Sequence, residues 1–341
     1  MMTETNTGNA LKIRPLALIL GASGGVGGAV ARSLHARGYR IRAMHRHPEK
    51  QREKYPAYEW VSGDAMSLKD VMAAAEGATL IFHGVNPPGY QNWQKLVLPM
   101  LDNTITAASA HHARILFPGT VYNFGPDALP EPVEDSPQNP TTRKGQIRVA
   151  VEERLREAAW NGTQVILVRA GDFFGGANVA NSWFGQMVKP GKPLKSVTRL
   201  GTPGVGHQWA YLPDLGETFA ALDARAGSLP AFASFQFEGY WDADGSGLID
   251  AIRKVSGNPK LPVRPFSWFM VPLLAPFMPL MREVAEVRYL WRTPLHMKND
   301  RLVAVLGHEP RTPIDEAVAA ALDDLGVRAP AGQSEREPEA A

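Results

Sequence analysis

The sequence predicts an α/β protein with a doubly wound parallel sheet and a smaller C-terminal lobe. Short apolar runs alternate with segments of helical periodicity through the first half of the chain, and a glycine-rich turn joins the first run to the first helix. Alternation at this spacing implies right-handed crossovers between parallel strands. The 341 residues, of which 44% are hydrophobic, are enough to bury an ample core.

The first unit is a buried strand, a glycine turn and a helix. The apolar run Leu16–Leu20 precedes the turn and residues 26–37 follow it with helical periodicity. Glycines three residues apart let the chain bend sharply and let a pyrophosphate approach the helix N-terminus, where free N–H groups favour an anion. This predicts a Rossmann-type dinucleotide site, and a plain strand-to-helix turn is the simpler alternative. The predicted contacts are Gly21, Ser23, Gly24, Gly25, Val26 and Gly27.

The end of the second predicted strand, residues 40–44, is basic. A site that binds NAD commonly has an acidic residue here, which accepts hydrogen bonds from the ribose hydroxyls. This chain instead has Arg46 between His45 and His47, and a guanidinium suits a 2′-phosphate. We therefore predict NADP as the cofactor, with NAD as the second choice. The alternative is that these three residues form a solvated loop.

Two further strand ends are candidates for cofactor contacts. Asp64 follows the predicted strand Glu59–Ser62, where it could accept a hydrogen bond from the adenine amino group or simply form a strand-end turn. The strand Ala78–His83 ends in the sequence His83-Gly84-Val85. Because loops at the carboxyl ends of parallel strands face the ligand crevice, we expect these three residues to line it.

The alternation continues to the middle of the chain. Residues 92–111 predict a long helix and residues 114–117 a strand, and the proline-rich residues 125–142 must form a loop over the site. A second long helix is predicted at 142–160, where Thr142 is the cap, and a strand at 164–169.

These elements predict a dinucleotide-binding core at 14–176. Residues 177–328 are expected to form mainly a substrate lobe, with a segment at about 207–224 returning to the core. The polar leader 1–13 and the Pro-, Glu- and Ala-rich tail 329–341 are expected to be disordered.

Composition excludes several classes of function. The absence of cysteine excludes disulfides, thiolate catalysis and thiolate metal sites, and the histidine spacing predicts no metal centre. The near balance of 36 basic and 34 acidic residues gives no charge excess for nucleic-acid binding. The leader lacks a signal-peptide core, which favours a cytoplasmic protein.

One apolar segment, residues 268–281, raises the question of membrane contact. It is too short to span a bilayer and contains Pro272, Pro276 and Pro279. We therefore expect no stable membrane insertion and interpret the segment as a broken helix over a pocket or core.

The order of the motifs is similar to that of the extended short-chain dehydrogenase/reductases, the NAD-dependent epimerase/dehydratase group. The resemblance covers nearly all of residues 15–328. It rests on the spaced glycines, on Asp64, on Thr120-Val121-Tyr122, on the sequence from Arg169 to Gly175, on the sequence from His207 to Asp214, and on Asn299-Asp300 with the sequence from Leu306 to Pro310. It also implies that Ala170 contacts the cofactor and that the two long helices form a homodimer.

The chain departs from this family at the catalytic helix. The family has Tyr-x-x-x-Lys where this sequence has Lys144 and Arg148, and its Ser or Thr falls nearest Pro118, so that Thr120 is the closest substitute. The resemblance therefore implies catalytic roles for Thr120, Lys144 and Arg148. Arg148 could hold the nicotinamide ribose but could not transfer a proton.

Lys144 has two interpretations. It could replace the tyrosine as general acid if Arg148 and partial burial lower its pKa. Alternatively, Lys144, Arg148 and Glu152 recur every four residues, which is typical of an exposed, salt-bridged helix face.

The predicted lobe is rich in aromatic residues, which favours a small, partly apolar substrate. The sequence therefore predicts an NAD(P)-dependent oxidoreductase or epimerase that acts on a carbonyl or alcohol carbon. Because the usual tyrosine is missing, the alternative is a non-catalytic NADP(H)-binding redox sensor or regulator.

Overall fold

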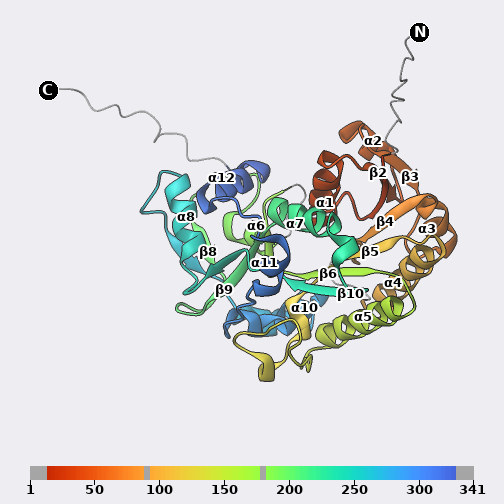
Figure 1. Cartoon of the computed structure of the whole chain (residues 1–341). Coiled ribbons are helices and arrows are strands. Elements are labelled where there is room, and N and C mark those ends of the chain that lie inside the picture. Colours follow the sequence, from red (N-terminus) through yellow and green to blue (C-terminus); the bar gives the residue numbers. More distant parts are fainter. Residues whose placement is uncertain (1–13, 88–92, 177–181, 328–341) are drawn as a thin grey trace, which may run out of the picture.

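A seven-stranded parallel sheet forms the centre of the computed structural model, which describes residues 14–87, 93–176 and 182–327 (Figure 1). The strand order is β10-β6-β5-β4-β1-β2-β3, and every neighbouring pair is parallel. The predicted doubly wound sheet is therefore confirmed. The strands are β1 (Leu16–Leu20), β2 (Arg40–His45), β3 (Glu59–Ser62), β4 (Ala78–His83), β5 (Arg114–Gly119), β6 (Val165–Arg169) and β10 (Phe232–Gln236).

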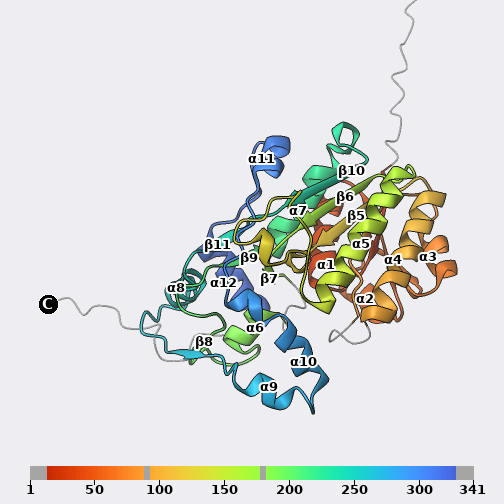
Figure 2. The ribbon, with the colours of Figure 1, turned by 90° about the horizontal axis from the view of Figure 1, so that it is seen from below.

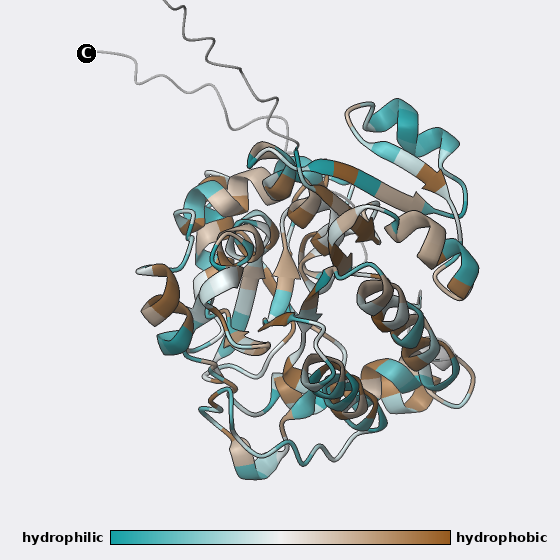
Figure 3. Ribbon diagram, turned by 45° about the vertical axis from the view of Figure 1, so that its right-hand side comes forward, coloured by the Kyte–Doolittle hydropathy of each residue, from teal (hydrophilic) through white to brown (hydrophobic). Residues whose placement is uncertain are grey.

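Helices cover both faces of this sheet, and β1 shows why. Its side chains alternate: Ala17 and Ile19 belong to one buried cluster, while Leu16, Leu18 and Leu20 belong to the other. The first cluster lies under α1 (Gly25–Ala36) and α7 (Leu212–Asp223). The second lies under α3 (Leu68–Ala75), α4 (Trp93–Ala110) and α5 (Arg143–Trp160), and the short α2 (Glu49–Lys54) follows β2. Figure 3 shows the hydrophobic strands enclosed by these helices.

Two helix starts follow local capping rules. Ser67 Oγ accepts a hydrogen bond from the amide of Asp70 at 3.3 Å, and Thr142 Oγ1 accepts one from the amide of Gly145 at 3.0 Å. Each hydroxyl satisfies an amide that has no partner within the helix. The predicted start of α5 at Thr142 is therefore confirmed.

A second lobe is built mainly from later segments. It contains a three-stranded sheet of order β11-β9-β7 and a two-stranded sheet of β12 and β8. The strands are β7 (Asp172–Phe174), β8 (Val197–Arg199), β9 (His207–Tyr211), β11 (Tyr240–Asp242) and β12 (Val263–Pro265). The helices are α6 (Trp183–Val188), α8 (Gly247–Val255), α9 (Met270–Leu274), α10 (Pro279–Glu286) and α12 (Ile314–Asp324), whereas α11 (Asp300–Leu306) packs on β10 and α7 of the core. Short 3₁₀ turns are η2 (Val121–Asn123), η3 (Pro126–Ala128), η4 (Ala226–Ser228) and η5 (Arg288–Trp291).

Only part of the segment at 207–224, which was predicted to return to the core, lies there. Helix α7 packs on α1, and β10 extends the central sheet beside β6. Strand β9, by contrast, belongs to the lobe sheet, where it pairs with β7 and β11. The leader 1–13, the tail 329–341 and the predicted helix start at residue 92 lie outside the described residues.

The broken apolar segment forms α9 and α10, which lie at the outer edge of the lobe in Figure 2. Within the described ranges, no helix combines the length and the apolar character needed to cross a bilayer.

Candidate functional site

The glycine turn after β1 has the geometry of an anion-binding turn. Gly21 has φ of +92°, and its carbonyl oxygen accepts a hydrogen bond from the amide of Gly24 at 2.9 Å. A Cβ on Gly27 would lie 2.3 Å from that carbonyl oxygen, and a Cβ on Gly21 would lie 2.7 Å from the carbonyl oxygen of Gly84. Glycine is therefore required at both positions by backbone contact, which brings α1 against the ends of β1 and β4.

The N-terminus of α1 is open to a ligand. Its cap, Gly24, is exposed and has no side chain that could accept from the first helical amides. Gly25 begins the helix, Val26 packs against the core, and Ser23 is half-buried in the turn. Uncapped amides at the start of a twelve-residue helix suit a pyrophosphate.

Arg46 follows directly after β2, the strand beside β1, and β1 leads into the glycine turn. The residue is exposed, and no hydrogen bond or ion pair holds it within the described part of the chain. His45 Nδ1 accepts a hydrogen bond from the amide of His47 at 3.0 Å, which shapes the loop around Arg46. The guanidinium is thus available for a phosphate.

Asp64 forms the strand-end turn that was its simpler interpretation. Its Oδ1 accepts a hydrogen bond from the amide of Met66 at 2.9 Å, and its own amide donates to Asp70 Oδ2 at 3.1 Å. Neither hydrogen bond uses Oδ2 of Asp64, which is the oxygen left for the predicted hydrogen bond to adenine.

At the end of β4, the backbone is available for the predicted cofactor contacts, but the side chain of His83 is not. The His83 ring is buried, stacks on Phe117 with centroids 5.6 Å apart, and has Nδ1 2.7 Å from Thr104 Oγ1. Burial, with a smaller effect from Arg148, lowers the pKa of His83 to about 3, so the ring is neutral. The side chain of His83 is therefore part of the core. Only its backbone, with Gly84 and Val85, remains for the cofactor.

Helix α5 brings Arg148 to this end of the sheet. Its guanidinium carbon lies 4.8 Å from the ring centroid of Trp93, and its charge acts on His83. Arg148 is half-buried, and its effect on His83 shows that it lies near the end of β4. Its role of holding the nicotinamide ribose stays a prediction.

Lys144 is the main departure from expectation. One of the two interpretations of the Lys144-Arg148-Glu152 stripe was an exposed face, but Lys144 and Glu152 are each only 2% exposed. The Lys144 ammonium forms ion pairs with Glu283 and Glu286 of α10. The interpretation as an exposed face was wrong at Lys144 because α10, more than 130 residues further along the chain, covers this residue.

Glu152, at the other end of the stripe, has a buried partner of its own. Its carboxylate accepts two hydrogen bonds from Arg169, at 2.9 and 2.6 Å. This bidentate pair holds α5 against β6. The next residue, Ala170, is 3% exposed and ends β6 on the ligand side of the sheet, so its predicted cofactor contact would be made by backbone.

Thr120 uses its hydroxyl locally. Its Oγ1 accepts a hydrogen bond from the amide of Tyr122 at 3.3 Å and caps η2, and it lies 3.4 Å from Asn123 Oδ1. The residue is half-buried at the carboxyl end of β5, beside Pro118.

A His–Asp pair lies where the sequence did not predict a catalytic group. His207 Nε2 lies 2.8 Å from Asp172 Oδ2, and the two side chains are 12% and 21% exposed. The imidazole stacks on Trp291 with centroids 3.9 Å apart and planes 9° apart. The carboxylate and the indole together fix the orientation of the ring.

This pair lines a small cavity of about 20 Å³ at the carboxyl ends of the core strands. Val121 follows β5 and Gly171 follows β6, and both contribute to the wall. Ligands of open α/β sheets bind at this edge. The approach of Asp172 to His207 depends on the pairing of β7 with β9.

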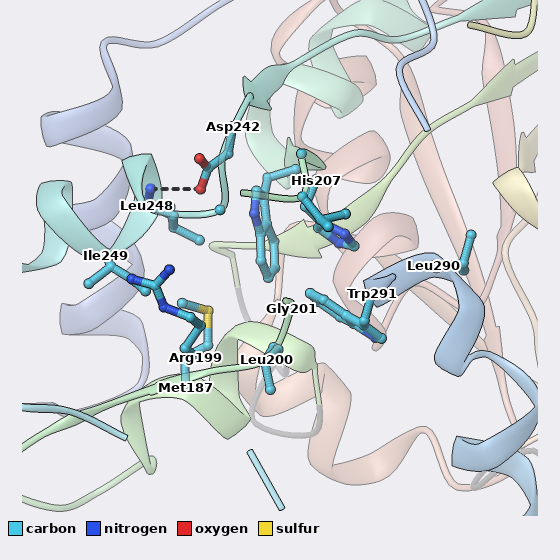
Figure 4. Close-up of a pocket in the computed structure, with 14 residues that line it drawn as sticks. Met187, Arg199, Leu200, Gly201, His207, Asp242, Leu248, Ile249, Leu290 and Trp291 are labelled. Atoms are coloured by element: carbon cyan, nitrogen blue, oxygen red, sulfur yellow. Dashed lines mark hydrogen bonds between the residues drawn. The ribbon is translucent and has the colours of Figure 1, made fainter. Parts of the chain in front are cut away.

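His207 also lines a second cavity on its other side. Figure 4 shows His207 next to Trp291, with Arg199 and Met187 further along the wall. In this cavity the carboxylate of Asp242 accepts a hydrogen bond from the amide of Leu248 at 3.1 Å. The imidazole therefore separates two spaces. Among the described residues, no group of His, Asp and Glu side chains could hold a metal ion.

Comparison with known proteins agrees with this geometry. Residues 21–173 match a protein family described as NAD(P)H-binding. No curated protein matches the sequence.

The fold matches solved structures over nearly the whole chain. A putative epimerase from Burkholderia cenocepacia J2315 has 16% identity and a TM-score of 0.73, with 92% of this chain and 98% of that chain covered. UDP-glucose 4-epimerase from Brucella ovis, in complex with NAD, has 13% identity and a TM-score of 0.72, with coverages of 92% and 99%. The UDP-Glc/GlcNAc 4-epimerase of Campylobacter jejuni has 14% identity and a TM-score of 0.71, with coverages of 91% and 98%. At these identities the likeness establishes the fold.

Proposed function

We propose that this chain is an NAD(P)-dependent oxidoreductase or epimerase. Residues 21–173 form an NAD(P)H-binding domain, and the chain has the fold of the extended short-chain dehydrogenase/reductases, the NAD-dependent epimerase/dehydratase group. The reaction takes place at a carbonyl or alcohol carbon of a small, partly apolar substrate. The aromatic wall formed by Trp209 and Trp291 around His207 supports a substrate of this character.

The residues of the turn fit a dinucleotide. Gly24 caps α1 without a side chain, Gly27 permits close approach of the backbone, and Arg148 stands at the next strand end. The exposed Arg46 supports NADP over NAD, since no acidic residue occupies the end of β2. When bound, the nicotinamide supplies the hydride donor or acceptor.

The single observation that supports an enzyme best is the His207–Asp172 pair. A hydride transfer to a carbonyl needs a proton for the oxygen, and the reverse reaction must remove one. An imidazole oriented by a carboxylate in a largely apolar wall has the chemistry for this exchange. We assign the proton exchange to His207 and the orientation of its ring to Asp172.

The hypothesis that Lys144 is the general acid stays a prediction. Its ammonium is ion-paired with two carboxylates and would have to leave both of them to reach a substrate. In the present proposal Lys144 holds α10 against α5.

The contacts of Lys144 also give the sensor hypothesis its specific support. In the family that this chain resembles, the residue at this position exchanges the proton, whereas here its side chain is buried and ion-paired. Thr120, the substitute for the family's hydroxyl, caps η2. A sensor needs cofactor binding alone, and neither feature prevents it.

One experiment separates the two functions. The purified protein is first tested for thermal stabilisation by NADPH, NADP⁺, NADH and NAD⁺, and then for NADPH oxidation with a panel of apolar aldehydes and ketones. An enzyme oxidises NADPH with at least one carbonyl compound, and His207→Gln abolishes that turnover while stabilisation by NADPH persists. Stabilisation that differs between NADPH and NADP⁺, with no turnover on the panel, would establish the sensor instead.

A further inference from the structure

An exposed apolar surface lies on α9, on α10 and on the link between them. Five of the ten large hydrophobic side chains that are exposed in the described chain fall within residues 269–278. The largest exposures are those of Phe277 at 82%, Phe269 at 68% and Leu273 at 62%, and the other two residues are Met270 and Met278. Single exposed apolar residues are ordinary, but five within ten residues mark an interaction surface.

The segment is held to the protein at both ends, so its exposed side chains stand on a fixed base. At the start, Trp268 Nε1 donates to the carbonyl oxygen of Leu200 at 2.6 Å, and Val271 is 2% exposed. At the end, Glu286 accepts a hydrogen bond from the backbone amide of Lys144 at 2.7 Å. The segment thus buries one side and leaves the other in solvent.

The most exposed charged residues in and next to this segment are basic. Within residues 264–292 the charged residues of the exposed class are Arg264, Arg282 and Arg292. The two acidic residues of this stretch, Glu283 and Glu286, pair with the buried Lys144. Arg282 also lines an open hollow of about 510 Å³, together with the exposed Arg143 and with Glu283 and Glu286.

We propose that the α9–α10 surface docks this protein on a membrane that contains anionic lipids. Phenylalanine, leucine and methionine side chains enter the boundary between headgroups and acyl chains, and the surrounding arginines bind the anionic headgroups. The depth is interfacial, because α9 and α10 have five and eight residues and neither can span a bilayer.

A second copy of this chain fits the surface less well. In a twofold dimer the same patch would meet itself, and Arg264, Arg282 and Arg292 of one subunit would face the same cations of the other. The two acidic residues of the segment, Glu283 and Glu286, are already paired with Lys144. An anionic bilayer offers both apolar contact and opposite charge.

Vesicle sedimentation with the full chain tests the proposal. Vesicles of phosphatidylcholine are compared with vesicles of phosphatidylcholine and phosphatidylserine in equal amounts. The protein should sediment with the anionic vesicles and much less with the neutral ones, and high salt should weaken the binding. The double variant Leu273→Gln/Phe277→Gln should bind the anionic vesicles at least about tenfold more weakly, since two apolar side chains no longer leave water.

The matched control is Trp160→Gln, which removes an apolar side chain that is 90% exposed on α5, away from this surface. This control should bind vesicles as the wild type does, and thermal unfolding should be unchanged in both variants because all three positions are exposed. Equal binding by the double variant and the wild type would overturn the proposal. So would an absence of vesicle binding combined with a dimer that the double variant converts to a monomer, since the surface would then be a self-interface.

Discussion

The carboxylate of Glu286 contacts both the backbone amide and the side-chain ammonium of Lys144. One carboxylate oxygen accepts from the Lys144 amide at 2.7 Å and the other lies 3.1 Å from its Nζ. The contact joins the first turn of α5, in the core, to α10, in the lobe. The contact engages Lys144, which stands at the position of the catalytic tyrosine in the family that this chain resembles.

Replacing Lys144 tests whether it is a structural residue or an acid. Lys144→Ala should lower the free energy of unfolding by about 2 kcal/mol, because it removes a buried charge from two carboxylates that remain. Turnover of an identified carbonyl substrate should persist if His207 exchanges the proton. Urea unfolding and steady-state kinetics measure the two effects. A loss of kcat without a loss of stability would identify Lys144 as the acid, and Glu286→Gln would then serve to examine its partner.

Replacing His207 should remove the proton exchange and leave the cofactor site intact. His207→Gln is expected to lower kcat/KM by about 10²- to 10⁴-fold, the usual contribution of a general acid or base. Asp172→Asn should have a smaller effect on kcat/KM, since the imidazole remains and only the contact that orients it is altered. The control His308→Gln replaces an exposed histidine of the lobe. Unchanged turnover in His207→Gln would contradict the assignment.

Replacing Arg46 should reduce the preference for the phosphorylated cofactor. Arg46→Gln is expected to weaken NADPH binding by roughly 10- to 100-fold, the value of a charge-assisted hydrogen bond, and to leave NADH binding unchanged. Isothermal titration with both cofactors measures the ratio, and Lys50→Gln, on the neighbouring α2, is the exposed control. Wild-type protein that binds only NADH and NAD⁺ would rule out a 2′-phosphate contact at Arg46.

Adding one methyl group to Gly27 should damage both the fold and the cofactor site. Its Cβ would lie 2.3 Å from the carbonyl oxygen of Gly21, so α1 must move away from β1. We expect a loss of about 1 to 3 kcal/mol in the free energy of unfolding and a loss of NADPH binding. Gly227→Ala is the matched control, since a Cβ there meets nothing within 4 Å. Normal NADPH affinity in Gly27→Ala would show that the turn does not hold the dinucleotide.

Stability should fall on acidification because of His83. Burial lowers the pKa of its ring from 6.5 to about 3. Between these values the unfolded chain binds a proton that the folded chain does not, so the free energy of unfolding falls as pH decreases, by at most about 1.4 kcal/mol per pH unit. Above the unfolded pKa the contribution is constant. Chemical denaturation at pH 7 and pH 5 should give a smaller difference for His83→Gln than for the wild type; an equal difference would mean that His83 is charged in the folded protein.

Local patterns predicted most of the core. The glycine turn, the cap at Thr142 and the alternation of strands with helices each depend on residues close in sequence, and the structure has all three. The contacts that were missed join distant segments. Asp172 reaches His207 through the pairing of β7 with β9, and no periodicity predicts which strands pair in a small lobe sheet.

Exposure was harder to predict than secondary structure. The spacing of Lys144, Arg148 and Glu152 defines one face of a helix, but it does not indicate what covers that face. For the apolar segment 268–281 the error in predicted exposure was the opposite one, because a segment expected to cover a pocket or core has exposed side chains. Its prolines correctly indicated a broken helix, yet Phe277 and Leu273 lie in solvent, because the segment packs on the lobe through other residues, among them Val271.

The contact between Glu286 and Lys144 has a thermodynamic consequence. One helical turn of α5 separates Lys144 from Arg148, so the same short stretch carries both the contact to the α9–α10 surface and the residue predicted to hold the ribose. Any shift of α10 on a bilayer that moves α5 would alter the affinity for the dinucleotide. By reciprocity, the dinucleotide would then alter the affinity for the bilayer by the same factor. If the α9–α10 surface docks on a bilayer and Arg148 holds the ribose, as proposed, the partition of this protein between solution and membrane would depend on the cofactor concentration.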